Sequence, residues 1–458
     1  MPVHTFWAAR KRCKFAMKAF MLMKKNVFLI FIFIVLFAFS QQAQPWSALG
    51  KGTNNNVFAV VAFDSVLYAA GTFDSADLKP VNNIAQWNGT SWNNLGSGIN
   101  GQVSALIIYN GALYAGGQFD SAGGIYTRNI ARWNGSTWDS VGGGINGKVN
   151  ALCIYNGVLY AGGGFDSAGG IYTYNIAQWN GTNWDSVSSG IGNSVYALAV
   201  YNGNLYAGGV FAQAGSVTAD YIAMWNNTTW SAVGGGVDNF VYALNVYQGN
   251  LYAGGTFANA GSVAANNIAA WNGTTWSALA NGLNSYVDAI GNYNGRMYVG
   301  GGFTLAGNTP VHNIASWDYT GWDSLGPGTD SYVNAFTVYN GNLIVGGSFN
   351  IAGRDSINYV AQWTAVPLGI NEVTVANHSS VYPNPNDGRF TIQFPVVSCQ
   401  NSEVKIYNML GEKVYSNELS ILHSQLSIDL INQPAGIYLY RITTEQGELV
   451  DNGKILIE

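Results

Sequence analysis

Charged residues and cysteine are both scarce in this chain of 458 residues. Only 9% of the residues are charged, and the three cysteines are Cys13, Cys153 and Cys399. Three scattered thiols exclude the disulfide framework of a small secreted domain and the paired cysteines of a zinc site. Cys153 lies in an apolar run, which predicts a small buried core residue rather than a reactive thiol.

Residues able to perform acid–base or nucleophilic chemistry are also few. Between residues 46 and 367 there is one histidine, His312, and no glutamate. A Ser-His-Asp triad needs a histidine beside an acid, and His312 is expected to be a loop residue. A pair of glycosidase carboxylates would have to be two aspartates. No EF-hand loop is present, and we expect no catalytic residue, no metal and no cofactor.

The charges that do occur are unevenly distributed along the chain. Residues 1–45 carry seven Lys or Arg and no acid, whereas residues 46–367 carry seven basic residues and fourteen aspartates. Residues 368–458 carry five basic and ten acidic residues. Without its basic leader the protein is acidic, which argues against nucleic acid as a partner. Glycine (58 residues) is abundant instead, as in all-β proteins with many tight turns.

The leader has the order of a secretory signal peptide. Lys24 and Lys25 precede an apolar run of thirteen residues, 27–39, and Ala38-Phe39-Ser40 forms a small-x-small pattern. We therefore predict a signal peptide over residues 1–40, cleaved after Ser40, with 1–20 as an overlong start. The alternative is a membrane anchor, for which the run is short. We expect no integral membrane span once the leader is removed.

Aromatic residues recur with a period of 46 between residues 46 and 363, which indicates a tandem repeat. One tryptophan series is Trp46, Trp92, Trp138, Trp184, Trp230, Trp276 and Trp322, and a second is Trp87, Trp133, Trp179, Trp225, Trp271, Trp317 and Trp363. A phenylalanine series is Phe73, Phe119, Phe165, Phe211, Phe257, Phe303 and Phe349.

Each repeat unit contains four short strand patterns. In the fourth unit the first two are separated by Asn202-Gly203, which suits a two-residue type I′ turn. Four antiparallel strands per unit, with a period in the forties, are typical of a propeller blade. The sequence therefore predicts an all-β fold, with a seven-bladed β-propeller over residues 41–367.

The array begins and ends in the middle of a unit. Trp46 opens a fourth strand with no unit before it, and the last unit ends on its third strand at Trp363. An unpaired strand edge at each end would be exposed. We therefore expect the Trp46 strand to pair with the Trp363 strand, so that the N-terminal strand closes the last blade.

Each unit resembles a kelch-type repeat. In the fourth unit the resemblance rests on the double glycine of Leu205-Tyr-Ala-Gly-Gly209, which is followed by an aromatic strand and a tryptophan. The resemblance covers residues 46–367. This sequence differs from typical kelch repeats in the length of its repeat and in having Trp where kelch repeats usually have Tyr. Kelch-type propellers serve as binding platforms and occasionally as enzymes. The resemblance implies a fold, and it leaves the function open.

The composition changes after Trp363. Residues 368–380 have the composition of a linker, and alternating strand patterns predict a small β-sandwich over residues 381–458. An ordered motif set there resembles the type A C-terminal sorting domain of the type IX secretion system. This implies handling by that secretion machinery and a location that is extracellular or on the outer cell surface. The motif residues are Tyr382, Pro383, Asn384, Pro385, Gly411, Gly436, Tyr438 and Lys454.

Alternating strands place the long connections of all units on one face, which we call the loop face, and the short Asn-Gly turns on the other. Loops held by a rigid scaffold commonly carry function. The candidate ligand-binding residues are therefore Tyr126, Arg128, Tyr172 and Tyr174. The alternative is that they only fill a solvated rim.

Three hypotheses for function remain. The first is a non-enzymatic platform that binds a glycan, protein or matrix component, the second is a polysaccharide hydrolase or lyase using loop-face aspartates, and the third is a structural coat component. Asp-Ser-apolar triplets also resemble the O-glycosylation signal of bacteria with this secretion system, although Asp-Ser suits turns equally. The candidate glycosylated residues are Ser75, Ser121 and Ser167.

Overall fold

The computed structural model describes residues 45–364 and 379–458, the latter without 394–401, 410–411, 420–424 and 445–448. These residues form strands and no helix, and they fall into two compact units divided between Ala365 and Val366. The predicted leader, its cleavage position Ser40 and most of the predicted linker lie outside the described residues.

No helix in the described part of the chain is long and apolar enough to cross a membrane.

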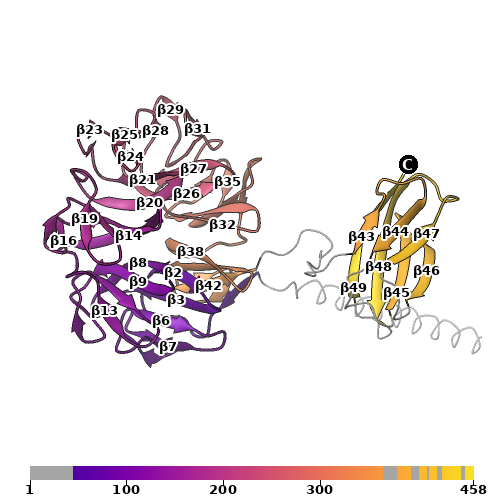
Figure 1. Ribbon diagram of the computed structural model, residues 1–458, viewed down its shortest axis with the longest axis horizontal. Helices are drawn as coiled ribbons and strands as arrows, with labels where there is room; N and C mark the ends of the chain where they lie inside the picture. The colour runs from indigo at the N-terminus through magenta and orange to yellow at the C-terminus, as the bar shows by residue number, and fades with distance from the viewer. Residues whose placement is uncertain (1–44, 365–378, 394–401, 410–411, 420–424, 445–448) are drawn as a thin grey trace, which may run out of the picture. The chain divides into compact units, whose positions relative to one another are not determined.

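Seven antiparallel four-stranded sheets, one for each sequence unit, make up residues 46–363 (Figure 1). The first strands, which we call the inner strands, are β2 (Val57–Phe63), β8 (Gln102–Tyr109), β14 (Lys148–Tyr155), β20 (Val195–Tyr201), β26 (Val241–Tyr247), β32 (Val287–Tyr293) and β38 (Val333–Tyr339). The second strands are β3 (Val66–Gly71), β9 (Ala112–Gln118), β15 (Val158–Gly164), β21 (Asn204–Gly209), β27 (Asn250–Gly255), β33 (Arg296–Gly301) and β39 (Asn342–Gly347).

The third and fourth strands complete each sheet. The third strands are β6 (Ile84–Trp87), β12 (Ile130–Trp133), β18 (Ile176–Trp179), β24 (Ile222–Trp225), β30 (Ile268–Trp271), β36 (Ile314–Trp317) and β42 (Val360–Trp363). The fourth strands are β7 (Trp92–Asn94), β13 (Trp138–Ser140), β19 (Trp184–Ser186), β25 (Trp230–Ala232), β31 (Trp276–Ala278), β37 (Trp322–Ser324) and β1 (Trp46–Ala48).

A two-stranded hairpin interrupts the connection from the second to the third strand in every unit. The hairpins are β4 (Ser75–Ala76) with β5 (Lys79–Pro80), β10 (Ser121–Ala122) with β11 (Ile125–Tyr126), β16 (Ser167–Ala168) with β17 (Ile171–Tyr172), β22 (Gln213–Ala214) with β23 (Val217–Thr218), β28 (Asn259–Ala260) with β29 (Val263–Ala264), β34 (Leu305–Ala306) with β35 (Thr309–Pro310), and β40 (Ile351–Ala352) with β41 (Asp355–Ser356).

The Asn-Gly turns and the double glycines have direct physical reasons. Asn110 and Gly111, between β8 and β9, have φ angles of 48° and 73°, as a type I′ turn requires. A Cβ atom added to Gly116 would lie 2.5 Å from Cγ1 of Val149 in the next inner strand, and one at Gly117 would lie 2.0 Å from the carbonyl oxygen of Gln102. Only glycine allows the second strand to pack this closely.

The seven inner strands lie side by side around a common centre (Figure 1). Each contacts the inner strand of the next unit, and β38 of the last unit contacts β2 of the first. The predicted pairing of the two array ends is confirmed, because Trp46 of β1 lies opposite Trp363 of β42. The seventh sheet therefore has the order β1-β42-β39-β38.

Two sets of hydrogen bonds join neighbouring units. Each fourth-strand tryptophan donates its indole N–H to a carbonyl 43 residues earlier, as Trp138 does to Leu95 at 2.9 Å. Trp46 does the same across the array ends, to Leu325 at 3.0 Å. The tyrosine hydroxyl that ends an inner strand donates to the next unit's turn, and Tyr339 closes this series on Ser65 at 3.1 Å. The first unit has Phe63 at this position.

The C-terminal unit contains two sheets that share one core. The first has β43 (Ser380–Tyr382), β44 (Arg389–Gln393) and β47 (Gln425–Asp429), and the second has β46 (Lys413–Leu419), β45 (Ser402–Asn408), β48 (Gly436–Thr444) and β49 (Leu449–Ile457). Ile392 of the first sheet and Ile406 of the second are both fully buried in this core. Two sheets packed face to face are the predicted β-sandwich arrangement.

Replacing Trp46 with alanine is expected to lower the free energy of unfolding by about 3–5 kcal/mol, the usual cost of removing a large buried aromatic side chain. Trp46 is 2% exposed, its ring lies 5.0 Å from that of Trp363, and its indole N–H is hydrogen-bonded. Urea denaturation measures the change. Ser47→Ala, in the same strand but exposed, is the control, and equal stability of the two variants would contradict the closing role of β1.

Candidate functional site

The four candidate residues from the loop face lie in two separate pairs. Tyr126 is 66% exposed at the end of β11, and the Arg128 guanidinium carbon lies 5.8 Å from its ring centroid, a cation–π distance. Tyr172, 74% exposed, stacks on Tyr174 with centroids 6.0 Å apart. The hairpin strands β11 and β17 contact the fourth strands β13 and β19, so both pairs lie over the outer part of their units. Among the described residues no ring contact or hydrogen bond joins the two pairs.

Two aspartates of the loop face are engaged in holding the backbone. Asp238 Oδ1 accepts hydrogen bonds from the N–H groups of Ala258 and Asn259 at 2.8 and 3.0 Å. Asp330 has the same role in the seventh unit, and Asn100 has it in the second. Because an amide oxygen serves equally well, these carboxylates are structural caps of the hairpins rather than reactive groups.

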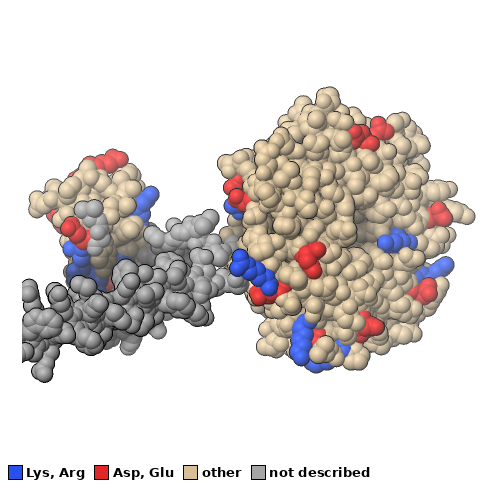
Figure 2. Space-filling model, turned by 180° about the vertical axis from the view of Figure 1, so that it is seen from behind, with Lys and Arg blue, Asp and Glu red and all other residues tan. Residues whose placement is uncertain are grey.

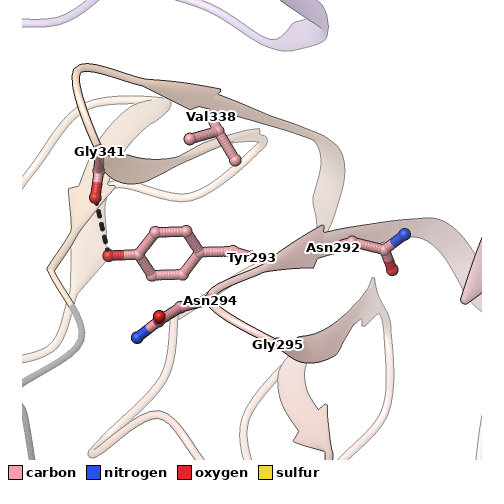
Figure 3. Close-up of a pocket in the computed structure, with 6 residues that line it drawn as sticks. All are labelled: Asn292, Tyr293, Asn294, Gly295, Val338 and Gly341. Carbon is pink, nitrogen blue, oxygen red and sulfur yellow. Dashed lines mark hydrogen bonds between the residues drawn. The ribbon is translucent and has the colours of Figure 1, made fainter. Parts of the chain in front are cut away.

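A shallow depression of about 510 Å³ lies on the opposite face, between the Asn-Gly turns of the sixth and seventh units (Figure 3). Its walls include Asn292, Tyr293 and Val338, and the Tyr293 hydroxyl donates to the carbonyl oxygen of Gly341 at 3.0 Å. The Asn292 amide donates to Val246 at 2.7 Å. These polar groups already connect neighbouring units, so the depression follows from the joints between units.

Constant and variable positions stand next to each other at the beginning of the inner strands, on the loop face. A valine there is fully buried in all seven units: Val57, Val103, Val149, Val195, Val241, Val287 and Val333. An alanine two residues later is also constant: Ala59, Ala105, Ala151, Ala197, Ala243, Ala289 and Ala335. The residues immediately before and after the valine vary in chemistry from unit to unit, and all are partly or fully exposed.

We call these fourteen variable residues the inner mouth. Before the valine they are Asn56, Gln102, Lys148, Ser194, Phe240, Tyr286 and Tyr332. After the valine they are Phe58, Ser104, Asn150, Tyr196, Tyr242, Asp288 and Asn334.

A β-bulge falls at the second of these positions in every unit. In the second unit the pairing of β8 with β9 shifts between Val103 and Ala105, and the other six inner strands shift at the equivalent place. A bulge leaves one residue without a ladder partner and redirects its side chain. The bulge therefore presents the residue after the valine to the centre of the array.

Aromatic rings fill the inner mouth in the fourth to seventh units. The Tyr196 and Tyr242 centroids lie 5.4 Å apart, and those of Phe240 and Tyr242 lie 6.3 Å apart. Tyr286 and Tyr332 form a further edge-to-face pair at 5.5 Å. These distances are typical of packed aromatic pairs, so the rings form an arc of partly exposed apolar surface.

In the first three units the inner mouth holds amide and hydroxyl groups, one lysine and one aromatic residue, Phe58. Gln102 donates to the Ser104 hydroxyl at 3.1 Å, and Asn150 donates to the carbonyl of Val195 in the next unit at 3.0 Å. Burial lowers the pKa of the Lys148 ammonium, and no ion pair involves Lys148 in the part of the chain that the structure describes. The inner mouth is thus mainly aromatic in the fourth to seventh units and mainly polar in the first three.

The surroundings of Asp288 disfavour the ionised form of its carboxyl group. Asp288 lies at the position where Asn150 and Asn334 donate to a backbone carbonyl of the following unit, and an ionised carboxylate has no proton to donate. Burial raises its pKa to about 6. Its charge acts on Tyr242 and Tyr286, whose pKa values are raised first by burial and also by this carboxylate. No hydrogen bond to its side chain is present among the described residues.

The surface of residues 45–364 carries few charges. Figure 2 shows acidic and basic side chains scattered over one face, without a large patch of either sign. The described residues also contain no group of three or more His, Cys, Asp or Glu residues that could hold a metal ion. Cys153 packs against the core, and burial raises the pKa of its thiol to about 11.

The candidate glycosylated serines are the first residues of their hairpins. Ser75, Ser121 and Ser167 open β4, β10 and β16 and are half-buried. The backbone N–H of Ser121 donates to Asn100 Oδ1 at 2.9 Å. The Asp-Ser pair therefore takes part in a hairpin cap in the second unit, and glycosylation of its hydroxyl stays a prediction.

The motif residues of the C-terminal unit have mainly structural contacts. Asn384 donates to the carbonyl oxygen of Lys454 at 3.0 Å and accepts from the N–H of Leu456 at 2.8 Å, which ties the segment after β43 to β49. The buried Tyr438 donates its hydroxyl to Pro434 at 2.7 Å. Of the other motif positions, Tyr382, Pro383, Pro385 and Lys454 are exposed, Gly436 begins β48, and Gly411 lies outside the described residues.

Comparison with known families identifies the C-terminal unit. Residues 380–458 match the family described as the secretion system C-terminal sorting domain. This is the sorting domain of type IX secretion, as its motifs indicated. The protein is therefore secreted through that system, to the extracellular space or the cell surface. No curated protein matches the chain.

Solved structures resemble the chain at low sequence identity. PorZ, a surface component of the type IX secretion system of Porphyromonas gingivalis, is 15% identical with a TM-score of 0.47, and the match covers 89% of this chain and 60% of PorZ. The computationally designed protein Ika8 is 14% identical with a TM-score of 0.44, over 69% of this chain and 98% of Ika8. A fungal alcohol oxidase of the AA5 family, in complex with copper, is 10% identical with a TM-score of 0.43, over 90% and 98% of the two chains.

Substituting asparagine for Asp288 is expected to stabilise the protein above pH 6. Because the folded-state pKa is raised to about 6, ionisation in the folded state lowers the free energy of unfolding as pH rises from 4 through 6. Asp288→Asn removes this loss, about 2–3 kcal/mol for a shift of this size, and the gain should vanish below pH 4. Urea denaturation between pH 4 and pH 8 measures it.

Asp238→Asn is the matched control for this prediction. The pKa of Asp238 is lowered: burial acts to raise it, but hydrogen bonds from Asn259 and Ala258 outweigh that effect. Its ionised form therefore stabilises the fold, and Asp238→Asn should give no gain above pH 6. An equal change in the free energy of unfolding above pH 6 in the two variants would contradict the unfavourable environment assigned to ionised Asp288.

Proposed function

We propose that residues 45–364 form a seven-bladed β-propeller of kelch-like repeats that acts outside the cell as a non-enzymatic binding platform. Seven four-stranded sheets, the contact of β38 with β2, and the pairing of β1 with β42 support the propeller. The double glycine that ends most second strands supports the kelch-like assignment. A surface or released location fits a protein whose ligand is extracellular.

The contrast between constant and variable positions in the inner strands carries this proposal. The buried valines and the buried or partly buried alanines are the same in all units because they hold the inner strands together. The neighbouring inner-mouth positions share the same backbone and face solvent, yet they hold six aromatic residues, four amides, two serines, one lysine and one aspartate. A structural role alone would be met by one residue type repeated seven times. Diverse, solvent-facing side chains directly beside constant packing positions fit recognition of a ligand.

The strain at Asp288 supports the same conclusion. Asparagine occupies its position in the third and seventh units and makes a backbone hydrogen bond there. The sixth unit instead has an acid whose ionised form is disfavoured by burial. Departures from the locally favoured residue concentrate at functional sites. We propose that Tyr126, Arg128, Tyr172 and Tyr174 form an outer contact area on the same face.

The hydrolase or lyase hypothesis has less support. Glycosidases of both stereochemical classes use two carboxyl groups flanking the bond to be cleaved. The inner mouth contains one, Asp288, and two of the loop-face aspartates, Asp238 and Asp330, are committed to hairpin caps. A platform that retains its ligand unchanged fits these residues better.

The full-length chain, applied to arrays of immobilised glycans and of extracellular matrix proteins, is expected to be retained on one class of ligand without releasing product. Retention is read by fluorescence of the labelled chain, and product release by mass spectrometry of the supernatant. Released fragments would show catalysis and refute the non-enzymatic function. Absence of retention on both arrays would refute a binding role and favour a structural coat component.

A further inference from the structure

We propose, resting on the binding function above, that the inner mouth binds a neutral saccharide. The sugar ring stacks on the aromatic arc of the fourth to seventh units, and its hydroxyl groups bond to Asp288 and to the amides of the first three units. The arc is formed by Tyr196, Phe240, Tyr242, Tyr286 and Tyr332.

The aromatic arc suits a ligand with one apolar face and a polar edge. Its rings are held by contacts with one another at 5.4–6.3 Å, yet each remains partly exposed, and Phe240 and Tyr332 are 37% and 47% exposed. Preordered rings lose little conformational entropy when a ligand stacks on them. The axial C–H groups of a pyranose form such an apolar face, whereas its hydroxyl groups point outward from the ring edge.

The charge of the inner mouth selects a neutral ligand. One lysine and one aspartate are its only ionised groups, so the fourteen positions sum to no net charge. Lys148 is three units away from Asp288 along the ring and makes no ion pair in the described part of the chain. A phosphorylated or sulfated ligand needs a cluster of cations, and the whole of residues 46–367 has only seven basic residues against fourteen aspartates.

Asp288 provides a charged acceptor that no hydrogen bond occupies among the described residues. The amide N–H groups of Asn150 and Asn334 are engaged by the backbone of the next unit at 3.0 and 3.2 Å. The carboxylate of Asp288 has no such bond among the described residues, and its two oxygens together accept from two donors. Adjacent hydroxyl groups of a sugar are a pair of donors at the matching spacing.

An extended peptide fits the inner mouth less well than a sugar. Peptides that bind to sheets usually add a strand to an exposed edge. The inner edges of these sheets face one another, and the side chains of Asn150 and Asn334 already cover carbonyl groups of the neighbouring edge. A compact ligand that contacts side chains from several units is the better match.

Affinity electrophoresis of the full-length chain in gels containing mannan, xylan, laminarin or hydroxyethyl cellulose tests the proposal. The variants take residues that other units have at the same position, so the backbone accepts them: Tyr196→Ser from Ser104, Tyr242→Asn from Asn150, and Asp288→Asn from Asn334. We expect retardation by at least one polysaccharide. Each variant should weaken it about tenfold or more, the effect of losing a stacking ring or a charged hydrogen bond.

Val200→Asn is the matched control. Val200 lies in β20 like Tyr196, but at the Asn-Gly end of the strand, where the sixth unit has Asn292. The affinity of the Val200→Asn variant for the retarding polysaccharide should stay within about twofold of that of the parent protein, a difference well under 1 kcal/mol. Thermal denaturation of every variant shows whether the fold is retained. Asp288→Asn, expected to be more stable than the parent, separates loss of binding from loss of folding.

The outcomes distinguish saccharide binding at the inner mouth from the broader proposal of a non-enzymatic binding platform. Absence of retardation in all four gels, or retardation that the inner-mouth variants leave unchanged, would overturn saccharide binding at the inner mouth. If Tyr242→Asn instead abolished capture of an array protein, the saccharide inference would fail while the binding platform stood. Release of sugar fragments, lost in Asp288→Asn, would refute the non-enzymatic function and retain the saccharide as substrate.

Discussion

The hydrogen bond from each fourth-strand tryptophan to the preceding unit is the constraint on which the rest of the structure depends. A single four-stranded sheet of this size cannot bury both of its faces, so it is stable only against two neighbours. The indole N–H groups connect consecutive units, and the bond from Trp46 to Leu325 extends the same connection across the array ends. The tyrosine hydroxyls form a second series on the opposite face, which Tyr339 extends to Ser65 across the array ends and which is interrupted only where Phe63 stands in the first unit. Every unit, including the first and last, therefore packs against a neighbour on each side.

Packing on both sides of every unit leaves the inner mouth free to vary. Packing between units is carried by the buried valines, the alanines and the double glycines, which recur with little change. The bulge in each inner strand separates these positions from the side chains that face the centre. A costly residue such as Asp288 is therefore accommodated in one unit without altering its neighbours, since the other six units retain their own contacts.

Much of the fold was predictable from the sequence, because the features that specify it are periodic. The tryptophan spacing predicted the repeat, the strand patterns and Asn-Gly turns predicted four strands per unit, and the incomplete units at the two ends predicted the partner of β1. The inner mouth was not predicted, because attention to long loops pointed to Tyr126 and Tyr172, which lie over outer strands of different units. Its signal was available in the alignment of the units with one another, where Val and Ala are constant on either side of the variable position. The β-bulge at this position could not be recognised from the sequence pattern of a single unit.

The pairing of β1 with β42 also determines how the mature molecule tolerates processing. Thr364 donates its backbone N–H to the carbonyl oxygen of Pro45 at 2.8 Å, so the first and last residues of the array are neighbours on one sheet. Proteolytic trimming on either side therefore falls beyond the last paired residues. Cleavage before Pro45 or after Thr364 would leave all seven four-stranded sheets with their strand pairings.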